Sequence, residues 1–157
     1  MSHDREAIVR LYRRWIDELW HADHDRIAVI AREIFSADFV GRWPEASVHG
    51  PDELAEWLRA GLVSFTEPRM TVDLGPLVDG DLVAARWTFR GRYAGGIPGA
   101  TAPVGTEIAF SGMEFLRYAD GRFVEYWVSS NEVDSHRQLG FAVAGCFEME
   151  AAPTTTT

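Results

Sequence analysis

The chain has 157 residues, of which 46% are hydrophobic and 25% are charged, as expected for one globular domain with a full core. Its formal net charge of −9 argues against nucleic-acid partners and against anionic membrane surfaces. Every basic residue is Arg, so lysine Schiff-base chemistry and a lysine-containing phosphate loop are excluded.

The expected compartment follows from what the sequence lacks. Cys146 is the single cysteine, so no internal disulfide can form and a reducing compartment is expected. The segment MSHDREAIVR has no apolar signal-peptide region, and no apolar run approaches membrane-spanning length. We therefore expect a cytoplasmic protein with one domain over residues 1–150 and a low-complexity, disordered tail over residues 151–157.

Helical periodicity predicts three helices before the first long strand. Ser2 can cap the first helix, whose apolar side chains recur at helical spacing as far as Trp20. A second, short helix is expected over residues 26–35, and a short extended segment follows at residues 38–40. Gly50-Pro51 indicates the start of a third helix, because proline suits the first helical position.

The apolar period changes to two after Arg69, which is typical of strands. We expect a strand over residues 70–77 with a hairpin turn at Asp79-Gly80. The next strand has the clearest alternation in the chain, and its expected inward side chains are Val83, Ala85, Trp87, Phe89 and Tyr93.

A second hairpin is expected over residues 106–132, followed by a short helix over residues 133–139. Its first strand is unusually long, and Gly112 is the natural place for a bulge or kink. Helices followed by antiparallel strands indicate an α+β fold. We expect a cone-shaped, strongly bent antiparallel sheet with three N-terminal helices over its concave face, enclosing a small-molecule cavity.

Glu114 interrupts the more apolar face of this second hairpin. Burial would raise the pKa of its carboxyl and make it a usable general acid or base near neutral pH. If the turn has three residues, Glu114 lies opposite Tyr126, and if the turn has two residues it lies opposite Trp127. The alternative role is an ion pair with one of the Arg residues, including one across a dimer interface.

Two further polar residues are candidates for contacting a substrate carbonyl. The Tyr93 hydroxyl can donate a hydrogen bond to it, or it can simply reach water at a rim. The Asn131 amide can polarise it, or it can cap the following helix. Glu132 offers another carboxylate, with the alternative role of an acid in the first turn of that helix.

The remaining site candidates are expected to bind substrate rather than to react with it. Arg42 can bind an anionic or carbonyl-rich group through its guanidinium, and Asp38 is either a second pocket group or a turn residue. His21 and His24 lack the further ligands of a zinc site, so no metal is expected. The other expected pocket residues, which would serve equally well in a core, are Trp15, Trp87, Tyr126 and Val128.

Several short stretches occur in a characteristic order, namely residues 38–40 (DFV), 48–54 (VHGPDEL), 80–91 (GDLVAARWTFRG), 110–112 (FSG), 120–127 (DGRFVEYW) and 137–140 (RQLG). By these stretches the sequence resembles the SnoaL-like polyketide cyclases of the nuclear-transport-factor-2-like superfamily. The resemblance implies an α+β cone with a deep pocket, usually a homodimer, with no metal and usually no cofactor. It also implies ring-closing aldol chemistry, dehydration, isomerisation, epoxide opening or hydroxylation.

The chain departs from this family at two expected catalytic positions. Family cyclases often carry His where this chain has Tyr93, and an acid just after the strand Trp, where this chain reads Val128-Ser129-Ser130-Asn131. From the resemblance as a whole we still expect a cofactor-independent cyclase of the isomerase or lyase type. It would belong to secondary metabolism, such as antibiotic biosynthesis, and act on an apolar polyketide-like molecule.

Two mechanisms stay open for this ring closure. Either Glu114 moves protons while Tyr93 and Asn131 hold a carbonyl, or the pocket templates a cycloaddition of a folded chain. The alternatives to a cyclase are a non-catalytic small-molecule-binding or dimerisation module, and a family hydrolase or hydroxylase.

Overall fold

The structure is a computed structural model and describes residues 5–143. Ser2, Cys146, the expected boundary at residue 150 and the tail 151–157 lie outside the described residues. In chain order the elements are α1 (Arg5–Arg13), a π-helical turn η1 (Arg14–Glu18), a 3-10 turn η2 (Leu19–His21), α2 (Ile27–Ile34), β1 (Phe35–Arg42), β2 (Ser47–His49), α3 (Gly50–Leu62), β3 (Phe65–Asp79), β4 (Leu82–Tyr93), β5 (Glu107–Ala119), β6 (Arg122–Ser130) and α4 (Glu132–Gln138).

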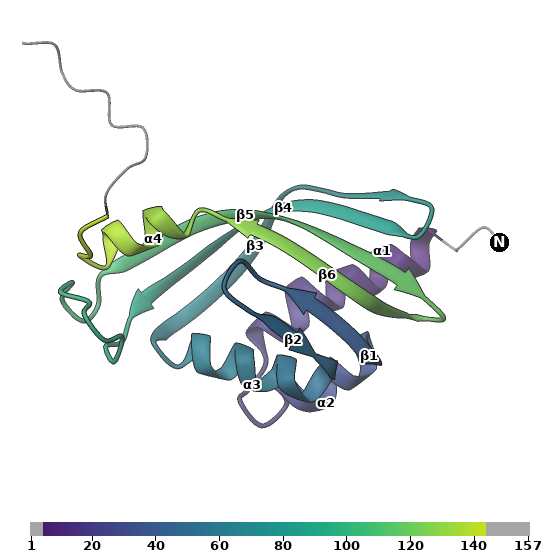
Figure 1. The fold of residues 1–157 in the computed structure, drawn as a ribbon, viewed down its shortest axis with the longest axis horizontal. Helices are drawn as coiled ribbons and strands as arrows, with labels where there is room; N and C mark the ends of the chain where they lie inside the picture. The colour runs from purple at the N-terminus through teal and green to yellow at the C-terminus, as the bar shows by residue number, and fades with distance from the viewer. Residues whose placement is uncertain (1–4, 144–157) are drawn as a thin grey trace, which may run out of the picture.

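The six strands form one curved, open sheet in the order β2-β1-β6-β5-β4-β3, with α1, α2 and α3 together on one side (Figure 1). The predicted α+β fold is confirmed. One detail differs, because β1 pairs with β6 in parallel while every other pair is antiparallel. Parallel neighbours need a long connection, and here the whole segment from β2 to β5 supplies it.

The first helix was expected as far as Trp20, and the helical segment ends one residue later at His21, but it is not regular α-helix throughout. It passes through a π-helical turn and then a 3-10 turn. Tyr12, Trp15 and Leu19 are all buried along this segment and pack under the sheet. Of the helices in residues 5–143, none combines the length and the apolar character that a membrane crossing requires.

The inward face predicted for β4 is confirmed, since Val83, Ala85, Trp87, Phe89 and Tyr93 are all buried. The predicted turn before it is wrong by one residue. Asp79 pairs with Leu82, so Gly80-Asp81 forms the two-residue turn, with Gly80 at a φ of +59°.

Both predicted pairings of Glu114 are wrong, because a bulge shifts the second hairpin. Ala119 pairs with Arg122, so the turn has two residues, but Val124 is then left without a partner in the β5–β6 ladder. The extra residue moves the register by one, and Glu114 lies opposite Val128.

Gly112 does not mark a bulge, because the β4–β5 register is continuous through it. It lies opposite Trp87, and a Cβ at this position would be only 2.5 Å from Cζ2 of the indole. The missing side chain therefore gives the Trp87 ring room to lie across β5.

Candidate active site

A cavity of about 450 Å³ lies between the concave face of the sheet, α3 and α4. Polar side chains form part of its wall, including Glu45, Ser130, Glu132 and His136. A smaller apolar pocket of about 140 Å³ shares part of its wall, including Gly61. The larger aromatic side chains of the main wall are Trp20, Trp43, Trp57, Trp87, Phe110 and Tyr126.

A second hollow, of about 560 Å³, lies between η2 and the start of β3. It is larger, but among the described residues that line it Trp20 is the only Trp, Tyr or Phe. Aromatic enclosure by the concave face is what a small apolar ligand requires, so the 450 Å³ cavity is the candidate active site.

Glu114 lies beneath this cavity as a hydrogen-bonded, buried carboxyl with 1% exposure. Its Oε1 accepts hydrogen bonds from the Tyr12 hydroxyl at 2.8 Å and from Trp15 Nε1 at 3.3 Å. Its Oε2 accepts one from the Tyr126 hydroxyl at 2.9 Å. Both oxygens are therefore occupied by donors from α1, η1 and β6.

Burial raises the pKa of Glu114 from its ordinary 4.5 to about 7, while the hydrogen bonds from Tyr12, Tyr126 and Trp15 act in the opposite direction. The Trp87 indole N–H also favours the charged carboxylate, although it lies outside hydrogen-bonding geometry and has no partner among the described residues. Burial, and then the neighbouring carboxyl, raise the pKa of both tyrosine hydroxyls.

The carboxyl of Glu114 does not form part of the cavity wall, whereas the side chains of Tyr126 and Trp87 do. Tyr126 therefore lies between the carboxyl and the cavity. Because the Tyr126 hydroxyl donates its proton to Glu114, this hydroxyl cannot at the same time donate to a ligand. The network fixes the position of an aromatic wall residue.

The model of the SnoaL-like polyketide cyclase family matches residues 10–139, which is most of the chain. The chain belongs to the SnoaL-like polyketide cyclase family. The comparison with curated protein sequences found no match.

Solved structures share the fold of this SnoaL-like chain at low sequence identity. TsrD from Streptomyces laurentii has a TM-score of 0.73 and 22% identity, covering 88% of this chain and 98% of its own. IdmH from Streptomyces antibioticus, a proposed polyketide cyclase, has a TM-score of 0.65 and 23% identity over 87% and 97% of the two chains. AclR from Streptomyces galilaeus, a proposed hydroxylase, has a TM-score of 0.66 and 22% identity over 87% and 94%.

Four of the candidates named from the sequence of this SnoaL-like protein lie on the cavity wall, namely Trp87, Tyr126, Val128 and Glu132. Trp15 does not, since it is buried beneath the wall with its ring edge against Tyr126. The structure thus brings together the predicted β4 and β6 residues, while Trp15 supports this wall from beneath through its contact with Tyr126 and its hydrogen bond to Glu114.

The predicted carbonyl-binding residues lie off the cavity wall. The Tyr93 hydroxyl accepts a hydrogen bond from the Ile97 N–H at 3.2 Å, within a second cluster around Ile108. Asn131 is exposed and directly precedes α4, but its side chain makes no capping hydrogen bond. Their catalytic roles stay predictions.

Asp38 and Arg42 also lie away from the cavity. Asp38 is exposed and accepts a hydrogen bond from Ser36. Arg42 pairs with Glu125 at 3.3 Å, and its guanidinium lies 5.2 Å from the centre of the Trp127 ring on the opposite face of the sheet.

The two histidines of the η2 region do not form a metal site. His21 Nε2 accepts the Met70 N–H at 3.2 Å, and His21 Nδ1 lies 3.1 Å from the Asp17 carbonyl oxygen, so this ring joins η2 to β3. Within residues 5–143, no group of three or more His, Cys, Asp or Glu side chains could hold a metal ion.

The sequence prediction missed several wall residues. Trp57 lies three residues after Leu54, at helical spacing in the predicted third helix, and Phe110 shares the parity of Glu114 on β5, so both carried a detectable pattern. His136 carried none, because α4 has only seven residues and no clear apolar stripe.

Proposed function

We propose that this protein is a polyketide-tailoring cyclase or isomerase that closes a ring in an apolar, polyketide-like molecule folded inside the aromatic cavity. The observation that carries this proposal is the cavity of about 450 Å³ with its aromatic wall, in a chain of this family. Holding two reacting carbons in a productive arrangement can supply much of the rate of a ring closure.

We favour catalysis by positioning the substrate over a mechanism in which Glu114 transfers the proton. Its two oxygens are occupied by Tyr12, Trp15 and Tyr126, and the carboxyl is off the wall. In this proposal, Glu114 acts as a positioning residue that holds Tyr126. No cofactor is included, since closing a ring by positioning needs no external electrons or transferred groups.

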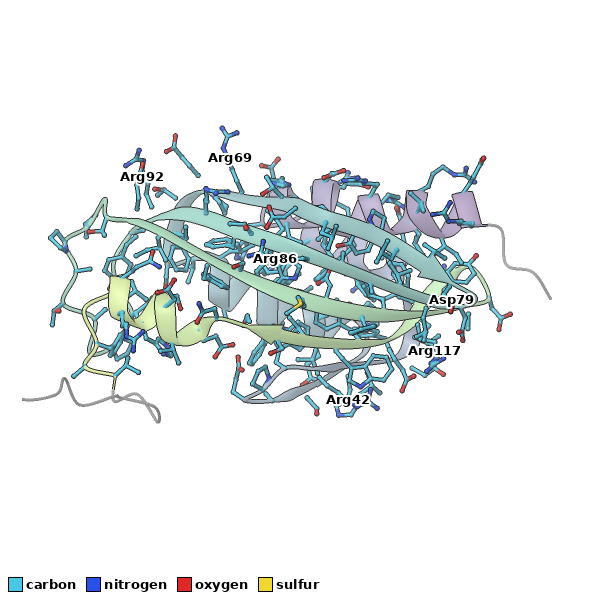
Figure 2. The ribbon with its side chains drawn as sticks, turned by 90° about the horizontal axis from the view of Figure 1, so that it is seen from above. Arg42, Arg69, Asp79, Arg86, Arg92 and Arg117 are labelled. Atoms are coloured by element: carbon cyan, nitrogen blue, oxygen red, sulfur yellow. The ribbon has the colours of Figure 1, made fainter. Side chains whose placement is uncertain are left out.

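The proposal extends to a homodimer formed through the convex face of the sheet. Two cross-strand rows run over this face, Leu74-Arg86-Met113 and Leu77-Ala84-Phe115. Four large apolar side chains in these rows are 52–62% exposed, which is typical of an association surface. Figure 2 looks onto this face, where Arg86 lies near the middle and Arg42 and Arg117 lie along one edge.

The function is tested by incubating the protein with linear polyenes and poly-β-keto thioesters and analysing the products by mass spectrometry. A ring-closed product of unchanged mass, or one that has lost a water, supports the proposal. Gain of an oxygen would indicate hydroxylation, and release of the free thiol together with the carboxylic acid would indicate hydrolysis. Tight binding without any turnover would instead support a binding module.

Two variants separate the two mechanisms. Glu114→Gln removes the carboxyl and keeps the side-chain volume, while Gly61→Leu narrows the cavity and keeps the carboxyl. A Cβ at Gly61 meets no atom within 4 Å, so the leucine can enter the open space. If positioning dominates, Gly61→Leu lowers the rate more than Glu114→Gln. The reverse order would favour Glu114 as the proton carrier.

A further inference from the structure

Two titratable side chains of α4 lie on the cavity wall, and they differ from Glu114 in being accessible there. Glu132 and His136 both line the cavity and are four residues apart on one helix. That spacing places them on the same side of α4.

Gln138, two residues after His136, fixes the position of α4 relative to the cavity. Its side-chain amide makes two hydrogen bonds with the backbone of Ala109 on β5, accepting the Ala109 N–H at 2.8 Å and donating to the Ala109 carbonyl oxygen at 2.7 Å. Leu139 is buried directly after it. The helix is therefore held to the sheet, and its wall residues are held with it.

Both side chains keep hydrogen-bonding capacity. Glu132 Oε1 accepts a hydrogen bond from the Ser130 hydroxyl at 3.0 Å, and among the described residues its Oε2 has no partner. The His136 ring packs edge-on against the Phe141 ring, with 5.4 Å between the ring centres. Neither nitrogen of His136 forms a hydrogen bond with a described side chain or backbone group. Glu114 differs, because donors occupy both of its oxygens.

We infer that Glu132 and His136 are the acid–base pair of this cavity, with Glu132 as the base and His136 as the acid. The inference rests on the proposed function and names the residues that move its protons. Histidine suits such a role, since its ordinary pKa is the closest of any side chain to neutral pH.

The step is an intramolecular aldol closure. Glu132 takes a proton from the carbon next to one carbonyl, and the electron pair of that C–H bond forms a C–C bond to a second carbonyl carbon of the same chain. The π electrons of this second carbonyl move onto its oxygen, which takes a proton from His136. The product has the mass of the substrate, and exchange with water at the cavity mouth restores both side chains.

The test needs no native substrate. Nitrobenzisoxazole is a planar, apolar probe whose ring carbon loses a proton to a base while its N–O bond breaks, giving a coloured cyanophenolate. We expect Glu132→Gln to lower kcat/KM for this probe by about 10-fold or more, in keeping with the contribution of a general base. His136→Gln should have a smaller effect, because the phenolate leaves with little help from an acid.

Two controls show whether a loss of rate is specific to Glu132 and His136 and whether it comes from misfolding. Glu56→Gln changes an exposed carboxyl of α3 that pairs with Arg59, and it should retain the wild-type rate. Nile red binding and thermal melting, measured on every variant, show whether the cavity and the fold persist. A Glu132→Gln/His136→Gln variant as fast as the wild type, or a greater loss in Glu114→Gln than in Glu132→Gln, would overturn the inference.

The outcome for the pair is separable from the outcome for the proposed function. Loss of nitrobenzisoxazole turnover in Glu132→Gln supports Glu132 as the base of the pair even if no polyketide surrogate is cyclised. Cyclisation that persists while this turnover is absent in the wild type supports the proposed function and rejects the pair.

Discussion

Replacing Glu114 with Gln removes a fully buried carboxyl and should change how the free energy of unfolding depends on pH. The pKa of this carboxyl is raised to about 7 in the folded protein, against an ordinary 4.5 for the unfolded chain. Below pH 4.5 both states hold the proton. Between the two values the unfolded chain binds fewer protons than the folded protein, so stability falls as pH rises.

The size of this loss follows from the difference between the two pKa values. A pKa difference of roughly 2.5 at about 1.4 kcal/mol per pKa unit corresponds to a loss of about 3 to 4 kcal/mol, complete once the pH passes the folded value. Glutamine has nearly the same volume and does not ionise. Glu114→Gln should therefore lack this loss, and the stability of the wild type minus that of the variant should fall by about 3 to 4 kcal/mol across the window.

The measurement is urea unfolding, followed by tryptophan fluorescence, of both proteins from pH 4.5 to about pH 8. Tyr12→Phe is the matched variant, because it keeps the carboxyl and removes a hydrogen bond that lowers the pKa of Glu114. In Tyr12→Phe the loss should still begin near pH 4.5 but become larger and extend to higher pH, because the pKa of Glu114 in the folded protein rises further. A wild-type-minus-Glu114→Gln difference that is independent of pH would refute the reasoning, and would mean that the three donors outweigh burial.

Three further predictions concern glycines and the convex face. Gly112→Ala should lower the free energy of unfolding by about 1–3 kcal/mol in urea titrations, since its methyl group overlaps the Trp87 ring. Gly61→Ala should raise it by up to about 1 kcal/mol, because alanine favours the helix and meets open space. Phe115→Glu should convert the proposed dimer to a monomer in light scattering, because it puts a charge on the exposed apolar rows; an unchanged mass would place the interface elsewhere.

Local periodicity was enough to predict the α+β fold and the inward face of β4, because alternation directly reports which side of a strand is buried. The pairing of Glu114 depended on an unpaired residue instead. Val124 changes the parity of β6, so that Phe123 and Tyr126 both face inward although they are three positions apart. That odd spacing was visible in the sequence, but a two-residue turn without a bulge, which pairs Glu114 with Trp127, fitted the sequence as well.

The candidate site was only partly predictable, for a related reason. Burial of Glu114 followed from its parity on β5, but its donors Tyr12 and Trp15 lie 102 and 99 residues earlier in the chain, where no local pattern connects them to it. His136 reaches the cavity because Gln138 binds the β5 backbone, which is a tertiary contact with no periodic signature.

The link between Glu114 and the first helix has a consequence for synthesis in the cell. Tyr12 and Trp15 emerge 102 and 99 residues before the carboxyl that they bind, a delay of roughly 5–20 s at ordinary rates of translation. During that time the apolar side of α1 has no completed sheet to cover it. We therefore expect docking of the first helix to be among the last steps of folding, with its apolar side exposed to aggregation until β5 and β6 have been made.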